Sequence, residues 1–149
     1  MPDLRELYQE VILDHAKHPR NCRRQETPSC HAQGHNPLCG DKVRIYLQLD
    51  GDIIRDISFD GTGCAISTAS ASLMTESLKG KTLEEADRLF EEFHHLVTSP
   101  AEAIAQFPEL GKLEVFAGVR EFPVRVKCAT LAWHTLKAAL ENKQNTSTE

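Results

Sequence analysis

The fold is decided by residues 41–63, which read DKVRIYLQLDGDIIRDISFDGTG. In the first ten residues apolar side chains alternate with polar or aromatic ones, a period typical of a strand with one buried face. The apolar positions are Val43, Ile45, Leu47 and Leu49. Asp50-Gly51 is a strong signal for a two-residue turn, and Ile53 to Phe59 follows as a second strand. This stretch predicts an antiparallel hairpin whose apolar face must be covered by other elements.

Helical patterns lie on both sides of this hairpin in the sequence. The expected helices run from Leu4 toward Pro19, from about 65 to 79, from 82 to 97, from Ser99 to about Phe107, and from Cys128 or Ala129 onward. Their start and stop signals are the capping boxes Asp3 with Glu6 and Thr82 with Glu85, the proline at Pro100, and Gly80. We also expect a short strand within 29–35 and a short turn or helix over 113–118.

The helices are segregated from the strands in the sequence instead of alternating with parallel strands. This order predicts an α+β fold, with a small antiparallel sheet of about three strands packed with helices. Residues 1–149 are expected to form a single domain. The polar end ENKQNTSTE (141–149) is expected to be frayed, and disordered from about residue 143.

Composition limits the classes of function. A chain of 149 residues with 40% hydrophobic residues is large enough for one domain with a sizeable core. The net charge of −5 argues against a protein that binds the nucleic-acid backbone. The N-terminus MPDLRELYQEV has no apolar signal region, and no apolar run is long enough to span a bilayer, so a cytoplasmic protein without a membrane partner is predicted. In a reducing compartment, five cysteines indicate reactive or metal-bound thiols more than disulfides.

Three of the five cysteines lie in settings that suit a metal-bound or sulfur-carrying thiolate. They are Cys39 in NPLCGD (36–41), Cys64 in GTGCAIS (61–67) and Cys128 in VRVKCATLAW (124–133). Gly40 lets the backbone turn so that Cys39 and Asp41 can face one point. Cys64 and Cys128 each precede a predicted helix, whose unpaired N–H groups favour the thiolate form. The three thiols and the carboxylate are therefore a candidate four-ligand site.

The ligand types limit the metal. Thiolates are soft ligands and carboxylates are hard ones, so a mixed site suits zinc, or an iron–sulfur cluster with one replaceable ligand. Three thiolates and a carboxylate around a divalent cation leave two excess negative charges, which nearby cations normally offset. Arg125 and Lys127 are candidates for this electrostatic support, because both would lie on one face of an extended segment. Either residue could instead steer an anionic sulfur donor or contact a partner protein.

Ordinary structural roles compete with these interpretations. A single cysteine is more often a small buried hydrophobic residue than a ligand, and Cys22 and Cys30 are expected to have no essential role. The wide spacing of the other three differs from the CxxC pairs of zinc fingers. An isolated Asp41 could cap a turn. Most histidines are expected at the solvated surface, whereas His15 lies on the apolar side of the first helix.

Four ordered segments carry a family resemblance: LYQEVILDHAKHPRN (7–21), NPLCGD (36–41), GTGCAISTASASLMTE (61–76) and FPVRVKCATLAWHTL (122–136). They resemble the U-type iron–sulfur cluster assembly proteins, the IscU and SufU group. The resemblance covers nearly the whole chain except the tail and the stretch around 82–118. It implies a compact α+β fold of the SufE/IscU type, with ligands at Cys39, Asp41, Cys64 and Cys128.

Departures from the IscU branch make the chain more similar to SufU. The IscU branch has a histidine directly before its last cysteine, where this chain has Lys127. That branch also has a shorter passage between its second and third cysteines. Its chaperone-binding motif is Pro-Pro-Val-Lys, whereas this chain has Phe122 followed by Pro123-Val124-Arg125. The resemblance therefore does not imply a dedicated chaperone partner.

The resemblance to SufU implies a zinc protein that accepts persulfide sulfur from a SufS-type cysteine desulfurase. The sulfur would pass to a downstream iron–sulfur scaffold or apo-acceptor. Cys39 is the expected acceptor, because its loop lacks helical restraint while Cys64 and Cys128 lie at predicted helix starts. Zinc is redox-inert, so it would organise the site until a partner supplies a replacement ligand.

Two other hypotheses remain open at this point. The protein could be a non-enzymatic scaffold that assembles and transfers a [2Fe–2S] or [4Fe–4S] cluster, with Asp41 as the weak ligand. It could also be an adaptor in which the metal is a structural clip. Only the sulfur-acceptor hypothesis attributes a sulfurtransferase-like activity to the chain.

Overall fold

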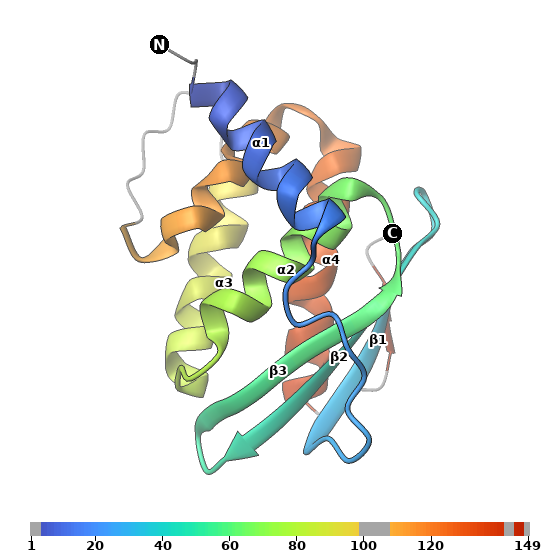
Figure 1. Ribbon diagram of the computed structural model, residues 1–149, viewed down its shortest axis with the longest axis vertical. Coiled ribbons are helices and arrows are strands. Elements are labelled where there is room, and N and C mark those ends of the chain that lie inside the picture. Colours follow the sequence, from blue (N-terminus) through green and yellow to red (C-terminus); the bar gives the residue numbers. More distant parts are fainter. Residues whose placement is uncertain (1–3, 99–107, 142–144, 148–149) are drawn as a thin grey trace.

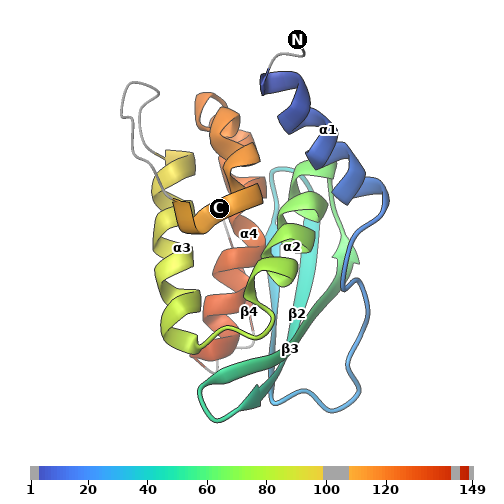
Figure 2. The ribbon, with the colours of Figure 1, turned by 60° about the vertical axis from the view of Figure 1, so that its left-hand side comes forward.

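The computed structural model describes residues 4–98, 108–141 and 145–147. Its helices are α1 (Leu4–Lys17), α2 (Ala65–Leu78), α3 (Leu83–Thr98) and α4 (Pro123–Leu140), with a 3₁₀ segment, η1 (Pro108–Glu121), before α4. Its strands are β1 (Cys30–Asn36), β2 (Asp41–Asp50), β3 (Ile53–Thr62) and β4 (Asn145–Ser147). The helices lie on one side of the sheet (Figure 1). The helices α2 and α4 pack directly against the strands, and α3 lies farther from the sheet, on the other side of α2 and α4 (Figure 2). The α+β prediction is confirmed.

Among the described residues the sheet has four strands in the order β3-β2-β1-β4, one more than expected, and it is mixed and not purely antiparallel. The predicted hairpin of β2 and β3 is antiparallel, but its two-residue turn is Gly51-Asp52 and not Asp50-Gly51, because Asp50 still pairs with Ile53. Gly51 has φ 63°. The predicted strand within 29–35 is β1, which pairs antiparallel with β2. The described part of the tail corrects our expectation of a frayed end, because β4 pairs parallel with β1 over Gln33–His35. Its backbone groups gain partners at an otherwise open sheet edge.

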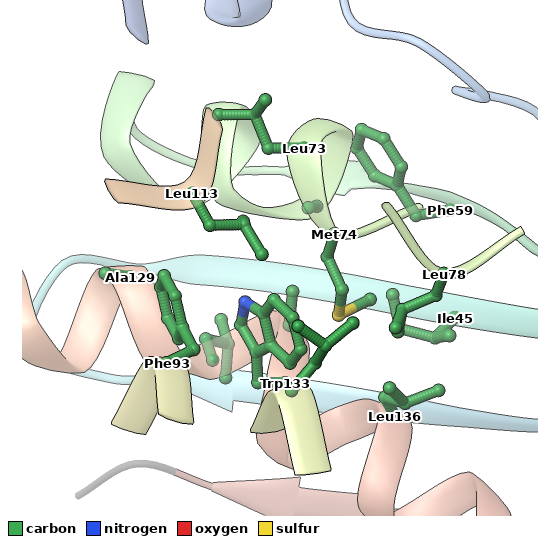
Figure 3. Close-up of a cluster of buried hydrophobic side chains, with 14 of the residues drawn as sticks. Ile45, Phe59, Leu73, Met74, Leu78, Phe93, Leu113, Ala129, Trp133 and Leu136 are labelled. Carbon is green, nitrogen blue, oxygen red and sulfur yellow. The ribbon is translucent and has the colours of Figure 1, made fainter. Parts of the chain in front are cut away.

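The hydrophobic core fills the space between the sheet and the helices. Figure 3 shows Trp133 of α4 among side chains from β2, α2 and α3. Its ring stacks on that of Phe93 at a centroid distance of 4.8 Å, and both side chains are fully buried. At Gly34 of β1 an added Cβ would overlap Thr135 Oγ1, so α4 lies against β1 at a distance that only glycine allows. This close approach places the N-terminal half of α4 beside the loop that follows β1.

The start of α4 differs from the prediction. We expected the helix to begin at Cys128 or Ala129, but it begins at Pro123, with Phe122 at the N-cap. The first helical position suits proline, because its fixed φ is already helical and no N–H is needed there. The alternating segment Val124 to Lys127 resembles a strand in sequence but forms the first turns of the helix. Cys128 therefore lies in the second turn and not at the helix start.

Other local predictions hold where the structure describes them. The capping box is formed, with Thr82 Oγ1 accepting from the Glu85 N–H at 3.1 Å and Glu85 Oε1 accepting from the Thr82 N–H at 3.3 Å. Gly80, at φ 86°, follows the end of α2, and the expected turn over 113–118 is part of η1. His15 is buried, with Nδ1 2.7 Å from Ser72 Oγ. The expected helix over 99–107 and the Asp3 cap lie outside the described residues. No helix in the described ranges is long and apolar enough to cross a membrane.

Candidate metal centre

The candidate ligands come from three parts of the chain that meet at one end of the sheet. Cys39 lies in the β1–β2 loop and Asp41 is the first residue of β2. Cys64 is the N-cap of α2, and Cys128 lies in the second turn of α4. The β1–β2 loop and the β3–α2 connection are neighbours at the same end of the sheet (Figure 1).

The four side chains converge. Cys39 Sγ and Cys128 Sγ are 3.2 Å apart. One ligating atom from each of Cys39, Asp41 and Cys128 lies within 4.8 Å of the others. Cys64 Sγ is 3.8 Å from Asp41 Oδ2, so the fourth residue contacts this group through the carboxylate. The fold thus brings together residues separated by up to 89 positions in the sequence.

Local backbone geometry positions the carboxylate. Gly40 has φ 70°, a left-handed conformation that favours glycine, and it reverses the chain between Cys39 and Asp41. Asp41 is completely buried, and its Oδ1 accepts the backbone N–H of Cys64 at 2.8 Å. At Gly63 an added Cβ would lie only 3.2 Å from Asp41 Oδ1. The glycine before Cys64 therefore lets the start of α2 approach the carboxylate.

The three thiols differ in exposure and in hydrogen-bond donors. Cys39 is exposed, Cys64 is half-buried and Cys128 is buried. Cys64 Sγ accepts the N–H of Ser67 at 3.4 Å, in the manner of an N-cap side chain. Cys128 Sγ accepts from Asn36 Nδ2 at 3.5 Å. Among the described residues, no N–H group donates to Cys39 Sγ.

Electrostatics at Cys128 differ from our expectation. We expected a helix start to favour its thiolate, but burial, together with hydrogen bonds to Cys39 and Asp41 and the nearby Cys64, raises the pKa of the Cys128 thiol far above its usual range. A bound cation reverses this effect, because a coordinating thiol is deprotonated by the metal charge. The site thus holds a buried carboxylate among three thiols. In the described part of the chain, no Lys or Arg side chain is bonded to any of the four. This donor set suits a metal cation.

Arg125 and Lys127 do not share a face, because the segment is helical and not extended. The Arg125 guanidinium lies over the Phe122 ring, 4.4 Å from its centroid, and the side chain is exposed. Lys127 is half-buried. Within the described ranges, neither forms a hydrogen bond or ion pair with the four candidate ligands, so any electrostatic support acts at longer range.

Asn36 is a site residue that the sequence analysis missed. It is the last residue of β1, pairs with Asp41 across the strands, and is completely buried. The available signal was its place at the start of NPLCGD, since asparagine commonly bonds to the backbone two residues ahead. Its Oδ1 accepts the N–H of Leu38 at 3.2 Å.

Cys22 and Cys30 lie apart from this group. The backbone of Cys22 forms an isolated β-bridge with Phe59 of β3. Cys30 is the first residue of β1, at the opposite end of the strand from the loop that carries Cys39. Burial raises the pKa of both thiols, with a further contribution from Asp60 at Cys22. In the described structure neither contacts a candidate ligand.

Comparison with known proteins gives consistent matches. Residues 7–129 match the family described as NifU-like N terminal domain. The chain is 41% identical to the zinc-dependent sulfurtransferase SufU of Bacillus subtilis, over 93% of this chain and 92% of that protein. It is 42% identical to the iron–sulfur cluster assembly scaffold protein IscU of Streptococcus pyogenes, over 95% of this chain and 87% of that protein.

A solved structure shares the fold. It is a protein of the thermophilic Fervidobacterium islandicum AW-1, described as a candidate iron–sulfur cluster assembly scaffold for the SUF system. Its TM-score is 0.83 at 36% identity, and the match covers 93% of this chain and 99% of that one. The fold and the sequence therefore lead to the same group of proteins.

Proposed function

The chain belongs to the NifU-like N terminal domain family, and we propose that it accepts persulfide sulfur at Cys39 from a cysteine desulfurase. The general assignment, iron–sulfur cluster assembly, follows from the family and from relatives with 41% and 42% identity. The finer proposal is a zinc-dependent acceptor that works with a SufS-type desulfurase in the cytoplasm and delivers sulfur to a downstream scaffold or apo-acceptor. The proposed zinc ligands are Cys39, Asp41, Cys64 and Cys128.

The observation that supports this proposal is the unequal exposure of two thiols in contact. Cys39 and Cys128 have sulfur atoms 3.2 Å apart, but Cys39 is exposed and Cys128 is buried. A protein partner can reach the first sulfur without entering the fold. Cys39 also lies in a loop next to Leu38, which is 62% exposed and offers apolar surface to a partner.

When bound, zinc would hold the thiolates deprotonated and in place without redox chemistry of its own. The chain's residues supply the transfer step. The Cys39 thiolate attacks the outer sulfur of the desulfurase persulfide, so that an S–S bond forms to Cys39 Sγ and the S–S bond of the desulfurase breaks. The desulfurase cysteine leaves as a thiolate, and Cys39 carries the persulfide. The sulfur oxidation states balance, so no external oxidant is needed.

Arg125 and Lys127 are proposed to support this step through their positive charge. Three thiolates and a carboxylate are more negative than one divalent cation can neutralise. Both residues lie on the first turns of α4, whose second turn carries Cys128. The exposed Arg125 can also meet an anionic group on the partner, such as the incoming persulfide.

The test is the stimulation of a SufS-type desulfurase by purified variants. Cys39→Ser is expected to abolish stimulation while the fold, followed by circular dichroism, is retained. Cys22→Ser is the matched control, because Cys22 is also exposed but lies outside the site. Full stimulation by Cys39→Ser would show that another residue accepts the sulfur.

A second candidate function is cluster assembly, which the 42% identical IscU scaffold protein favours. In that case the buried Asp41 would be the hard, weakly held ligand that keeps a cluster labile. Anaerobic reconstitution followed by transfer to an apo-acceptor tests this candidate. A protein that forms no transferable cluster under these conditions is not such a scaffold.

A further inference from the structure

Asn36 has no assigned role, yet its amide contacts both sides of the candidate site. Nδ2 donates to Cys128 Sγ at 3.5 Å, and Oδ1 accepts the Leu38 N–H at 3.2 Å. One buried side chain thus joins the buried thiol on α4 to the loop that carries the exposed thiol Cys39.

We propose that Asn36 is a positioning residue whose N–H donation to Cys128 makes Cys39 the thiol that is released to a sulfur donor. This inference rests on the proposed function and specifies how the site chooses between two sulfur atoms in contact. It concerns the order in which the thiols react and is independent of which partner delivers the sulfur.

The three thiols differ in their N–H donors. Cys64 Sγ accepts from the Ser67 N–H, and Cys128 Sγ accepts from Asn36 Nδ2, while Cys39 has no N–H donor among the described residues. A hydrogen bond to a thiolate fixes its orientation and lowers its nucleophilicity, so a thiolate with an N–H donor reacts with an electrophile less readily. Two thiols are therefore restrained as ligands and the third is not.

The backbone restrains Cys39 and Cys128 unequally. Cys128 is a buried residue of α4, and this helix packs closely on β1 at Gly34. Cys39 lies in the short loop between Asn36 and Asp41, the last residue of β1 and the first of β2. Because Asn36 Oδ1 bonds to the Leu38 N–H, the turn before Cys39 stays fixed when its sulfur leaves the group. Release then moves only the few residues around Cys39.

Loss of the Asn36 donor would change the reactivity of Cys128. Without Asn36 Nδ2, Cys128 Sγ would keep its burial but lose its N–H partner. A thiolate without an N–H donor is less fixed in orientation and more nucleophilic, so the reactivity of Cys128 becomes more similar to that of Cys39. The site would then release either thiol.

The experiment is competitive alkylation of the zinc-loaded full-length chain with limiting iodoacetamide, read out by peptide mass spectrometry at Cys39 and Cys128. The wild type should be modified first at Cys39. Asn36→Asp keeps an oxygen for the Leu38 N–H but has no N–H donor, and Asn36→Ala removes both groups. Each variant should lower the Cys39-to-Cys128 ratio about tenfold or more, the usual scale for groups that orient metal ligands.

A matched control and a second readout separate this role from a general loss of stability. Gln25 is also a buried amide, but its Nε2 donates to Tyr46 O and Ser58 Oγ, in the middle of β2 and β3. Gln25→Ala should leave the alkylation ratio unchanged even if it lowers the melting temperature. In Co²⁺-substituted protein, the thiolate charge-transfer absorption should shift in the Asn36 variants and not in Gln25→Ala.

The outcomes distinguish the inference from the proposed function. If the wild type is not modified preferentially at Cys39, the acceptor assignment itself fails. If the wild type is selective and either Asn36 variant keeps that selectivity, the positioning role of Asn36 is wrong and the acceptor assignment stands.

Discussion

Gly34→Ala is expected to destabilise the fold by forcing α4 away from β1. An alanine Cβ at this position would overlap Thr135 Oγ1 and would lie 3.1 Å from Leu131 Cδ1. The Thr135 side chain cannot easily rotate away, because it is fully buried and its hydroxyl donates to Leu131 O at 2.7 Å. The helix that carries Cys128 must therefore shift.

The expected magnitude follows from two opposing effects. Overpacking of this kind costs about 1–3 kcal/mol, while replacing glycine restricts the unfolded chain and returns about 0.4–1 kcal/mol. The net loss is about 1–2 kcal/mol in the free energy of unfolding. For a chain of this size, that corresponds to a fall of about 2–8 °C in Tm. Zinc retention should also weaken, because Cys128 moves relative to Cys39.

Urea unfolding of the zinc-free protein measures this change. Gly118→Ala is the matched control, because no atom lies within 4 Å of a Cβ added there, and it should be neutral or slightly stabilising. Thr135→Ala in the Gly34→Ala background should recover part of the loss, with a coupling energy of about 1 kcal/mol. A Gly34→Ala protein as stable as the wild type, or strictly additive effects in the double variant, would refute the close-approach argument.

Three further predictions address the site and the local structure. Asp41→Ala should lower zinc affinity at least about tenfold in a chelator competition, and unchanged affinity would contradict a ligand role. Burial, then the charges of His94 and Lys137, lower the pKa of His134 below 6.5 in the folded state, so the unfolded state takes up the proton first. In the zinc-free protein, the free energy of unfolding should therefore fall as the pH is lowered from 6.5 toward 5. His134→Gln should reduce that fall, and a variant whose free energy of unfolding has the same pH dependence as the wild type would exclude His134 as a cause. Thr82→Ala should cost about 1 kcal/mol in urea unfolding through loss of the N-cap, and a negligible change would mean that the cap is not stabilising.

The parts of the fold that were predicted correctly depend on short stretches of sequence. The hairpin follows from alternation and a turn signal within residues 41–59, and the start of α3 follows from a capping box within four residues. The same local reasoning failed at Pro123–Lys127, where alternating Val and basic residues resemble a strand. There the packing of α4 against the sheet stabilises a helix that propensity alone does not indicate.

The candidate site also combines features that local sequence predicts with features that it does not. Gly40 between Cys39 and Asp41, and the glycines before Cys64, are visible in the sequence, and they indicated which residues belong together. The sequence contained no sign of Asn36 as a donor to Cys128, because the two are 92 residues apart and meet only when α4 packs on β1. Hydrogen bonds between a candidate ligand and a residue distant in sequence depend on the final packing and not on any local pattern.

The sequence by itself determined the hairpin, most helix boundaries, the identity of the four candidate ligands and the resemblance to a family, because each depends on residue type and short-range order. Only the tertiary structure decided that Cys39 is exposed, that Cys128 in contact with it is buried, and that no N–H group of the described residues donates to Cys39 Sγ. The physical reason is that exposure and hydrogen-bond partners are set by elements distant in sequence. The absence of a side chain at Gly34 allows α4 to lie against β1, and in this packed structure Cys128 of α4 is buried while Cys39 of the β1–β2 loop is exposed.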